Sequence, residues 1–459
     1  MLNDIDEIYN LGFNDNEFIL DTKVINCVEK SYSNLINSIE NGVEFYGVHT
    51  GFGANVTTKV NFLNYKYNQL ELLRYLQVGI GKFFSQSIVK RALKLQVIKL
   101  SKGFSGIHPD TFKKLLLLAN SNHVHEVYEY GSLGASGDLI PMAHAVAPIF
   151  ENNNNIGPRD VLSLVNTNAM MASYAIELYK RIQNNMEKVF SITALNSFSL
   201  LVTKEPFSSI GHSINAAYLP NVQIAGEKII NFRKNIEKYY KLNIENELIQ
   251  KRVSYNVPLQ EKYSIRCSPQ VLGNILNQLK IAEQNIYSES LIIADNPLII
   301  SSEGENKSWH GGMFYTAALG SSVDMLMDVI GRATELLDRQ ILILMHPSTS
   351  HGLSENLGSE NDLHLKGLHQ LLSSLQQQIR SLAVPSRLMS FSAESNNQDI
   401  LPCTMAALHN LKSSIEIFDL ILNISHFIAE KALHIRFQLD IPQYLILTKY
   451  REYDIPIYN

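Results

Sequence analysis

The chain has 459 residues, and its 39 basic and 44 acidic residues give a formal net charge of −5 at pH 7. This balance leaves no broad basic surface, so it argues against nucleic acid and anionic membranes as partners and favours small-molecule chemistry by elimination. Three widely spaced cysteines (Cys27, Cys267 and Cys403), an acidic first segment, and no stretch approaching the ~20 apolar residues that span a bilayer together predict a cytoplasmic protein without disulfides.

Helical periodicity dominates the first part of the chain. Apolar residues recur every three or four positions from 24 to 39, with Gly42 as the expected stop, and two more helices are expected between about 68 and 101. Residues 151–158 form a polar loop in this interpretation, because asparagine, glycine and proline interrupt both helical and strand periodicity. Only short strands are expected, near 123–130 and 201–206.

Three long apolar stripes predict long helices in the second part. Each stripe keeps the spacing of one helix face, and such a face is buried only when helices pack side by side. The stripes are Leu319, Val323, Leu326, Ile330, Ala333 and Leu337; Leu365, Leu368, Leu372, Leu375, Ile379 and Leu382; and Leu408, Leu411, Ile415, Phe418 and Leu422. The sequence therefore predicts a mainly α protein, with an N-terminal catalytic part at residues 1–200 and a long-helix bundle at residues 201–459.

One stretch of small residues, GSLGASGDLIP at positions 131–141, could carry unusual chemistry. Its glycines let backbone approach backbone around Ala135-Ser136-Gly137. If the amide nitrogen of Gly137 attacks the carbonyl carbon of Ala135, and water is lost from the ring and from Ser136, the product is an electrophilic five-membered ring. Composition alone favours an ordinary glycine-serine turn, so the interpretation depends on the rest of the sequence.

The whole string resembles the signature of the aromatic amino acid lyase family, which includes histidine, phenylalanine and tyrosine ammonia-lyases and related 2,3-aminomutases. The resemblance implies that Ala135, Ser136 and Gly137 cyclise autocatalytically to 4-methylideneimidazol-5-one (MIO), a prosthetic group made from the chain itself. It also implies a long-helix bundle of the fumarase/aspartase-like type, and a homotetramer whose active sites combine residues of three subunits. Further motifs span residues 46 to 399. The segment after Asp399 is shorter than in the family, which implies trimmed C-terminal helices.

The segment YGVHTGFG at positions 46–53 is similar to a second family motif, in which the tyrosine removes the β-proton of the substrate. The resemblance therefore makes Tyr46 the general base. A phenol suits that task only when nearby cations or helix N-termini lower its pKa.

Tyr75 and Leu76 stand at the pair of positions where the family sets its substrate selectivity. Histidine lyases typically carry Ser-His there, tyrosine lyases His-Leu and phenylalanine lyases Phe-Leu, so Tyr-Leu is nearest to the last of these. An aromatic residue beside a leucine makes an apolar slot for a benzene ring. The hydroxyl of Tyr75 leaves the choice between phenylalanine and tyrosine open.

Other motifs supply binding residues by resemblance. Asn166 matches the asparagine that contacts the prosthetic group in relatives, although Thr167 replaces the glycine that follows it there. The segment QEKYSIR carries over Gln260, Tyr263 and Arg266, and the planar fork of Arg266 suits the carboxylate of an amino acid substrate.

Two more motifs complete the expected substrate site. Asn296 in DNPL and Phe314 in GGMF match family site residues, while Met313 replaces an asparagine. Gln398 stands in SAESNNQD, at the position where histidine lyases place a glutamate that suits an imidazole. Gln398 and Leu76 together therefore favour phenylalanine or tyrosine over histidine.

These motifs predict an ammonia-lyase that converts an aromatic L-amino acid to an arylacrylate and ammonia. A 2,3-aminomutase uses the same electrophile but returns ammonia to the β-carbon, and it stays open as an alternative because retention depends on how tightly loops close over the site. A catalytically silent helical homologue is the other alternative. No metal site is expected, because His123 and His125 alternate as on a strand and suit a solvated pair.

Overall fold

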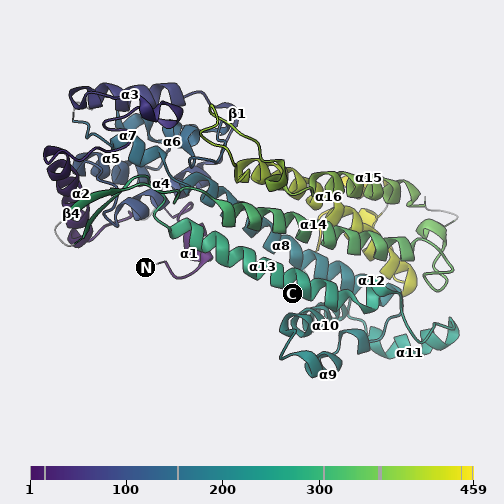
Figure 1. Ribbon diagram of the computed structural model, residues 1–459. Helices are drawn as coiled ribbons and strands as arrows, with labels where there is room; N and C mark the ends of the chain where they lie inside the picture. Colours follow the sequence, from purple (N-terminus) through teal and green to yellow (C-terminus); the bar gives the residue numbers. More distant parts are fainter. Residues whose placement is uncertain are drawn as a thin grey trace. The chain divides into compact units, whose positions relative to one another are not determined.

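The computed structural model describes residues 2–14, 17–151, 155–302, 305–359, 364–445, 447–456 and 458. These residues are mainly helical, as predicted, with short strands only (Figure 1). The chain divides into two compact units, and each unit is built from three segments. Unit 1 comprises Met1–Leu178, Ala282–Asp324 and Pro385–His409, and unit 2 comprises Tyr179–Ile281, Met325–Val384 and Asn410–Asn459.

Four long helices contribute residues to both units: α8 (Ala169–Ser199), α13 (Ser268–Leu291), α14 (Ala317–Leu344) and α16 (Thr404–Arg436). At 1.5 Å per residue, the 31 residues of α8 extend over roughly 46 Å, more than the ~30 Å diameter of a small domain. Helices of this length do not fit within one compact unit. The units therefore differ from the consecutive parts 1–200 and 201–459 expected from the sequence.

Unit 1 holds the shorter helices of the first part of the chain. They are α1 (Ile5–Asn10), α2 (Thr22–Glu40), α3 (Tyr65–Leu76), α4 (Gln86–Leu100), α5 (Pro109–Ala119), α6 (Leu139–Val146) and α7 (Asp160–Val165). Helices α2, α3 and α4 confirm the predictions for 24–39 and 68–101. Helix α2 begins after Asp21, whose carboxylate accepts a hydrogen bond from the backbone N–H of Lys23, and it ends just before Gly42 in the left-handed conformation.

Two small antiparallel sheets complete unit 1. Strands β1 (Ile80–Phe83) and β2 (Tyr128–Tyr130) pair with each other, as do β3 (Leu298–Ser302) and β4 (Glu305–Trp309). The predicted strand near 123–130 contains β2, but the one at 201–206 is wrong. There Leu201 ends α8 in the left-handed conformation, and Glu205–Phe207 form a 3-10 turn around Pro206, which has no N–H to offer a sheet.

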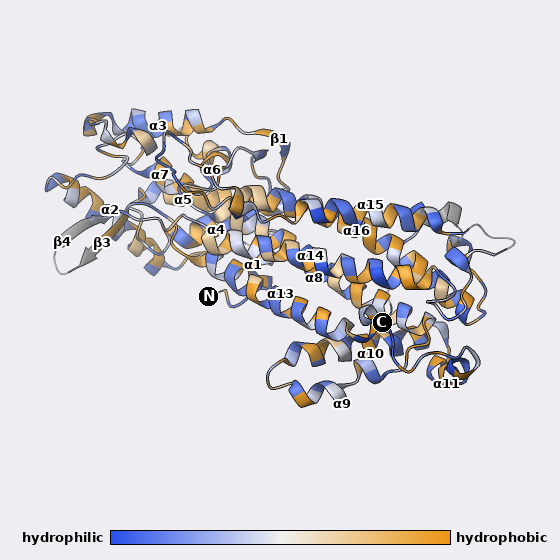
Figure 2. Cartoon of the chain, turned by 45° about the vertical axis from the view of Figure 1, so that its right-hand side comes forward, coloured by the Kyte–Doolittle hydropathy of each residue, from blue (hydrophilic) through white to orange (hydrophobic). Residues whose placement is uncertain are grey.

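Unit 2 holds the remaining helices and most of the long bundle: α9 (Ser209–His212), α10 (Pro220–Tyr240), α11 (Ile244–Ser254), α12 (Tyr263–Arg266) and α15 (Lys366–Leu382). The predicted stripes on α14, α15 and α16 supply buried leucine, isoleucine and phenylalanine side chains, and Figure 2 shows apolar and polar positions alternating along α15. Polar contacts join the helices where they pack. Asn196 of α8 bonds Gln340 of α14 at 3.0 Å, and Arg181 of α8 pairs with Asp419 of α16 at 2.9 Å.

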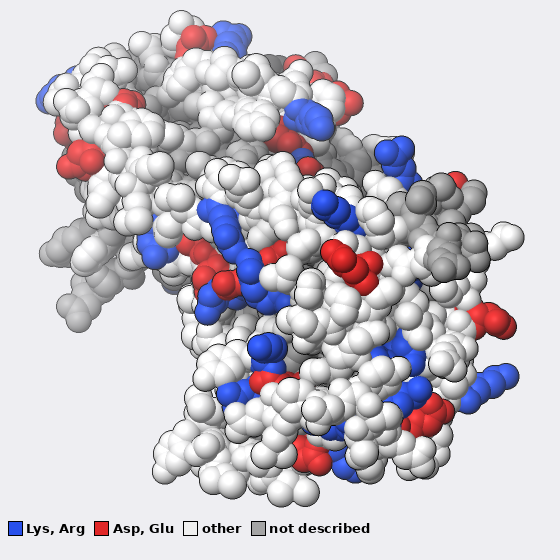
Figure 3. All heavy atoms as spheres, turned by 90° about the vertical axis from the view of Figure 1, so that its right-hand side faces the viewer, with Lys and Arg blue, Asp and Glu red and all other residues white. Residues whose placement is uncertain are grey.

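The surface carries both signs of charge. On the face drawn in Figure 3, lysine and arginine side chains are interspersed with aspartate and glutamate, and no large area has a single sign. This agrees with the small net charge. Within the described ranges, no helix is both long and apolar enough to cross a membrane.

Candidate active site

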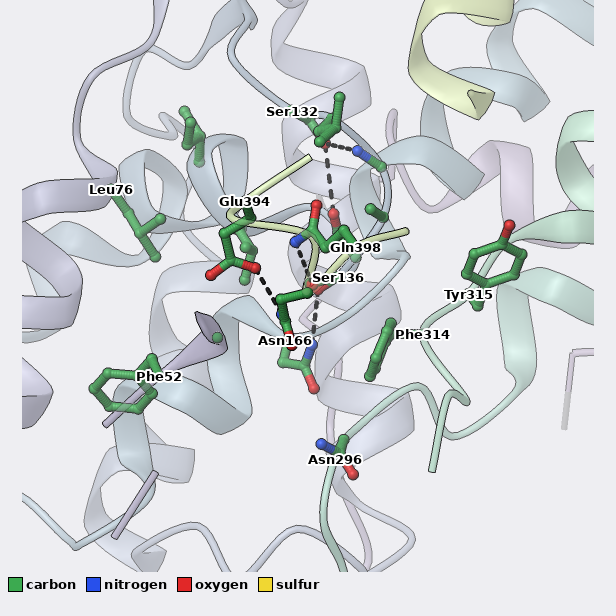
Figure 4. A pocket seen from close by; sticks show the side chains of 18 of the residues that line it. Phe52, Leu76, Ser132, Ser136, Asn166, Asn296, Phe314, Tyr315, Glu394 and Gln398 are labelled. Atoms are coloured by element: carbon green, nitrogen blue, oxygen red, sulfur yellow. Dashed lines mark hydrogen bonds between the residues drawn. The ribbon is translucent and has the colours of Figure 1, made fainter. Parts of the chain in front are cut away.

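A cavity of about 700 Å³ lies in unit 1, within the usual range for small-molecule sites (Figure 4). Segments far apart in the sequence line it: the loop after Phe45, the end of α3, the glycine-rich loop at 131–141, the end of α7, and the loops that contain Asn296 and Gln398. Most residues predicted from the sequence meet here. They are Tyr46, Tyr75, Leu76, Ala135, Ser136, Gly137, Asn166, Asn296, Phe314 and Gln398.

The backbone of the glycine-rich loop turns sharply at two glycines. Gly134 and Gly137 have φ angles of +73° and +81°, a region that favours glycine. A Cβ atom at Gly137 would lie 2.4 Å from the carbonyl oxygen of Thr167, so the packing excludes any side chain at this position. Thr167 is not among the residues with positive φ, so its replacement of the family's glycine leaves this backbone unstrained.

Two amide side chains hold Ser136. Asn166 donates from Nδ2 to the Ser136 carbonyl oxygen at 2.7 Å, and Gln398 donates from Nε2 to Ser136 Oγ at 2.9 Å. Figure 4 shows the two amides on either side of Ser136. Within the described chain, the buried oxygens Asn166 Oδ1 and Gln398 Oε1 have no hydrogen-bond partner. Small residues in a tight turn, held by two amide side chains, fit the MIO group that the resemblance implies.

Asp138 connects the glycine-rich loop to the first turn of α8. Its backbone N–H donates to the Thr167 carbonyl oxygen at 2.6 Å, and its carboxylate accepts from the backbone N–H groups of Met170 and Met171 at 2.6 and 3.1 Å. Burial raises the pKa of Asp138 to about 7, against the two N–H groups and Lys99, which lower it. The carboxylate thus satisfies backbone donors of the first turn of α8 and ties that helix to the loop.

The Tyr46 loop is held by a hydrophobic cluster. Phe45 and Val48 pack with Leu35 of α2 and Ile299 of β3, and this leaves Tyr46 facing the cavity. The Tyr46 hydroxyl oxygen accepts a 2.7 Å hydrogen bond from the backbone N–H of Gly53.

The electrostatics around Tyr46 differ from what its proposed task demands. Burial raises the pKa of Tyr46, the Gly53 N–H lowers it, and the nearby Glu394 carboxylate raises it further, so the net shift is upward. A phenol that acts as the general base needs a lowered pKa instead. No basic residue is among the described residues that line the cavity, while Glu394 and Asp399 are acidic. The described cavity lining of a single chain therefore supplies no cation to favour the phenolate.

Aromatic and aliphatic side chains surround one end of the cavity. Leu76, in the last turn of α3, is buried, and Tyr75 beside it is 53% exposed, with a pKa that burial raises. Phe52 lies edge-on to Tyr46, with 6.4 Å between ring centroids. These side chains give the cavity an apolar surface suited to an aromatic ring.

Asn296 and Phe314 come from the loops around the β3–β4 hairpin. Asn296 Oδ1 accepts from the backbone N–H of Gly311 at 2.9 Å. The preceding Asp295 pairs at 3.0 Å with Arg159, which is fully buried. Met313, which departs from the family's pattern, is 54% exposed and does not line the cavity, so this departure leaves the cavity wall unchanged.

Three predicted site residues do not line the cavity. Gln260, Tyr263 and Arg266 belong to unit 2, where Tyr263 is 71% exposed and the Arg266 guanidinium stacks 4.6 Å from its ring centroid. The carboxylate-binding arginine expected from the sequence is therefore absent from the described wall of the cavity.

Glu394 lines the cavity but is not among the residues predicted from the sequence. Its carboxylate accepts from the backbone N–H of Ala54 at 3.0 Å and from Asn397 Nδ2 at 2.7 Å, so it joins the Tyr46 loop to the Gln398 loop. The available signal was its place in the motif that contains Gln398, four positions earlier. The described residues contain no cluster of side chains able to hold a metal ion.

The chain belongs to the aromatic amino acid lyase family, whose model matches residues 3–154 and 151–449. Membership of this family makes it a carbon–nitrogen lyase with a mainly helical fold. A histidine ammonia-lyase of Pseudoalteromonas atlantica is 26% identical over 425 residues, which cover 87% of this chain and 80% of that protein. A tyrosine 2,3-aminomutase of Myxococcus sp. is 26% identical over 435 residues, covering 83% and 80%. The solved structure of Pantoea agglomerans phenylalanine aminomutase shares the fold, with a TM-score of 0.83, 23% identity, and coverage of 98% of this chain and 92% of that one.

Proposed function

We propose that this protein eliminates ammonia from an aromatic L-amino acid, phenylalanine or tyrosine in preference to histidine, to give an arylacrylate. The observation that carries the proposal is the contact between Gln398 and Ser136, at the centre of a cavity with apolar walls. The β-proton of an amino acid is not acidic, so elimination needs a strong electrophile. Polypeptides lack one unless the chain makes it.

Ala135, Ser136 and Gly137 would form the MIO group, as the Gly137 nitrogen bonds to the Ala135 carbonyl carbon and two water molecules leave. The group supplies an electrophile for the substrate amine or ring. Asn166 and Gln398 orient the loop through the hydrogen bonds to Ser136. Tyr46 takes the β-proton, and Tyr75, Leu76, Asn296 and Phe314 enclose the substrate.

The preference against histidine rests on Gln398 and Leu76. An amide at 398 donates a hydrogen bond to Ser136 and carries no charge to pair with an imidazolium. Leu76 offers a ring only apolar contact, whereas a histidine there would offer a hydrogen bond. A benzene ring matches both features better than an imidazole does.

The carboxylate of the substrate requires a cation that the described cavity wall of one chain lacks. Association into a homotetramer in the cytoplasm would solve this, with Gln260, Tyr263 and Arg266 of other copies completing each site. The exposure of Tyr263 supports this assignment, because an exposed tyrosine stacked on an arginine is suited to an interface. A cation brought in this way would also lower the pKa of Tyr46.

A 2,3-aminomutase is the second candidate, and the similarity to the Myxococcus tyrosine 2,3-aminomutase favours it. The two activities share the electrophile and the base, and they differ in whether ammonia returns to the β-carbon before the arylacrylate leaves.

Incubation of the purified protein with L-phenylalanine, L-tyrosine and L-histidine separately, followed by chromatography, tests the proposal. Arylacrylate from phenylalanine or tyrosine is the expected product, and a β-amino acid would mean an aminomutase. The intact mass of the wild type should be lower than its sequence mass by two water molecules, while Ser136→Ala should show the mass of the simple substitution. An uncyclised, inactive wild type would instead indicate a silent homologue.

A further inference from the structure

A second, much smaller cavity lies in unit 1, and Asn166 forms part of its wall. Its volume is about 10 Å³, which suits one water-sized molecule and no substrate. It is lined by Gln96, Lys99, Ser105, Asn166, Thr167 and Asp295, with apolar neighbours. Asn166 also lines the large cavity, so this residue separates the two spaces.

Hydrogen bonds to backbone carbonyl oxygens fix the orientation of two side-chain amides that line this small cavity. Asn166 Nδ2 donates to the Ser136 carbonyl at 2.7 Å, and Gln96 Nε2 donates to the Ser163 carbonyl at 2.8 Å. Turning either amide over would set an oxygen against a carbonyl oxygen, so each amide keeps its oxygen on the other side. Within the described residues, Asn166 Oδ1 and Gln96 Oε1 are buried and have no partner.

The third oxygen belongs to Asp295. Its Oδ1 accepts from Arg159 at 3.0 Å and from the backbone N–H of Asn296 at 2.7 Å, while the buried Oδ2 has no partner among the described residues. Burial raises the pKa of Asp295 to about 6, against the lowering by Arg159, so the group is ionised at neutral pH and can only accept. All three residues are more than nine-tenths buried.

We infer that the small cavity binds a single water-sized hydrogen-bond donor, held by Asn166 Oδ1, Gln96 Oε1 and Asp295 Oδ2. Three buried, unpartnered acceptor atoms on residues that line a space for one molecule favour a ligand that donates hydrogen bonds. Water and ammonium share this chemistry. The bound molecule donates to Asn166 Oδ1. This contact fixes the orientation of the amide and keeps its N–H directed at the loop that contains Ser136.

The site does not depend on which amino acid the enzyme accepts. The ammonium alternative is the more informative one, because ammonia is the product of the proposed reaction. Lys99 also lines the small cavity, and its Nζ donates hydrogen bonds to Asn168 Oδ1 and to the Glu289 carbonyl oxygen.

The test is a high-resolution crystal structure of the wild type grown from sodium salts, with a second crystal soaked in thallium(I), an anomalous scatterer that replaces ammonium. A density peak at about 2.7–3.2 Å from Asn166 Oδ1 and from at least one of the other two oxygens is expected. An anomalous thallium peak there assigns an ammonium site, and ordinary density alone assigns water. A cavity without density, or filled by a rearranged side chain, overturns the inference.

Gln96→Met supplies an independent test, because it keeps the volume while it removes the acceptor Oε1 together with the Nε2 hydrogen bond to the Ser163 carbonyl. The peak should be lost, and the melting temperature should fall. Gln376→Met is the matched control, since Gln376 is also a buried glutamine with an unpartnered Oε1 within the described chain, but lies outside the small cavity. If ammonium is the ligand, ammonium chloride should raise the melting temperature above that in sodium chloride for the wild type and Gln376→Met only. A Gln96→Met protein that keeps the peak unchanged would contradict the inferred site.

Discussion

Gln398 donates a 2.9 Å hydrogen bond to the hydroxyl oxygen of Ser136, a residue 262 positions earlier in the chain. The direction of this bond matters, because an amide can donate to a serine oxygen while a carboxylate can only accept from it. The identity of residue 398 therefore fixes which way the Ser136 hydroxyl points, and a carboxylate there would add a negative charge to the cavity wall.

Exchange of this amide for a carboxylate tests its role in specificity. Gln398→Glu should lower kcat/KM for phenylalanine and tyrosine by about 10- to 100-fold, because a carboxylate at this position places a charge against the apolar ring of the substrate. The ratio of kcat/KM for histidine to that for phenylalanine should rise. Intact mass separates this outcome from failed cyclisation, and an unchanged ratio in a cyclised variant would remove Gln398 from the specificity argument.

Removal of the Tyr46 hydroxyl tests the general base. Tyr46→Phe should reduce kcat by about 10²–10⁴-fold, the usual contribution of a positioned base. Because the phenolate is the active form, the wild-type rate should climb with pH by about tenfold per unit below the pKa that Tyr46 has in the assembled enzyme. The pH profile of kcat/KM should lose this alkaline limb in Tyr46→Phe. A variant that keeps both its rate and the limb would falsify the assignment.

Replacement of Glu394 should shift the alkaline limb of the pH profile of kcat/KM. Its charge raises the pKa values of Tyr46 and Tyr75, so Glu394→Gln should shift the alkaline limb to lower pH. Glutamine retains an oxygen that accepts from the Ala54 N–H, which preserves the link between the two loops. Glu335→Gln is the control, because it makes the same change in net charge on an exposed pair with Arg332. A limb that stays in place in Glu394→Gln would show that this carboxylate does not act on Tyr46.

Gly137→Ala should block formation of the tight loop. The new Cβ would lie 2.4 Å from the Thr167 carbonyl oxygen at a residue with φ of +81°. We expect a loss of more than ~1 kcal/mol in stability and a chain that keeps its full, uncyclised mass. Gly367→Ala is the matched control, because a Cβ there meets no atom within 4 Å, and alanine favours the α15 helix. Cyclisation of Gly137→Ala to completion would contradict the packing argument.

Arg159 should matter for stability more than any surface cation. Arg159→Met leaves the buried Asp295 carboxylate unpaired, which costs about 3–5 kcal/mol when one partner of a buried pair is removed. The native pKa of Asp295 is already raised, and it rises further without Arg159, so lowering the pH protonates the group and relieves the penalty. The loss of melting temperature should thus be larger at pH 8 than at pH 5. Arg332→Met, on an exposed pair, should change stability by about 1 kcal/mol or less at either pH.

The sequence predicted the helical elements well, because their signal is local. The stripes that run through Leu326, Leu372 and Phe418 are buried helix faces, and Gly42 does follow the end of α2. The predicted strand at 201–206 failed, since a few apolar residues also suit the turn after a helix. The division into units could not be read from the sequence, because it depends on how far each long helix extends in space.

Most residues of the candidate site were predicted from motif resemblance. The structure adds which residues surround each of them in three dimensions. Tyr46, Asn166 and Gln398 line one cavity, and the pKa of Tyr46 is raised there by burial first and by the Glu394 carboxylate, which comes from a distant segment, to a lesser extent. Such three-dimensional neighbours leave no periodic trace in a sequence. The same holds for Arg266, whose motif is clear although it does not line the cavity.

The two hydrogen bonds to Ser136 also bear on when, during synthesis and folding, the loop around this residue reaches its final geometry. Asn166 lies 30 positions beyond Ser136, and Gln398 lies 262 positions beyond it. Closing the longer loop costs chain entropy that only an assembled core offsets, so the second contact forms late in folding. A nascent chain that does not yet include residue 398 lacks one of the two side chains that donate hydrogen bonds to Ser136. Full synthesis and folding therefore precede the finished geometry of this loop.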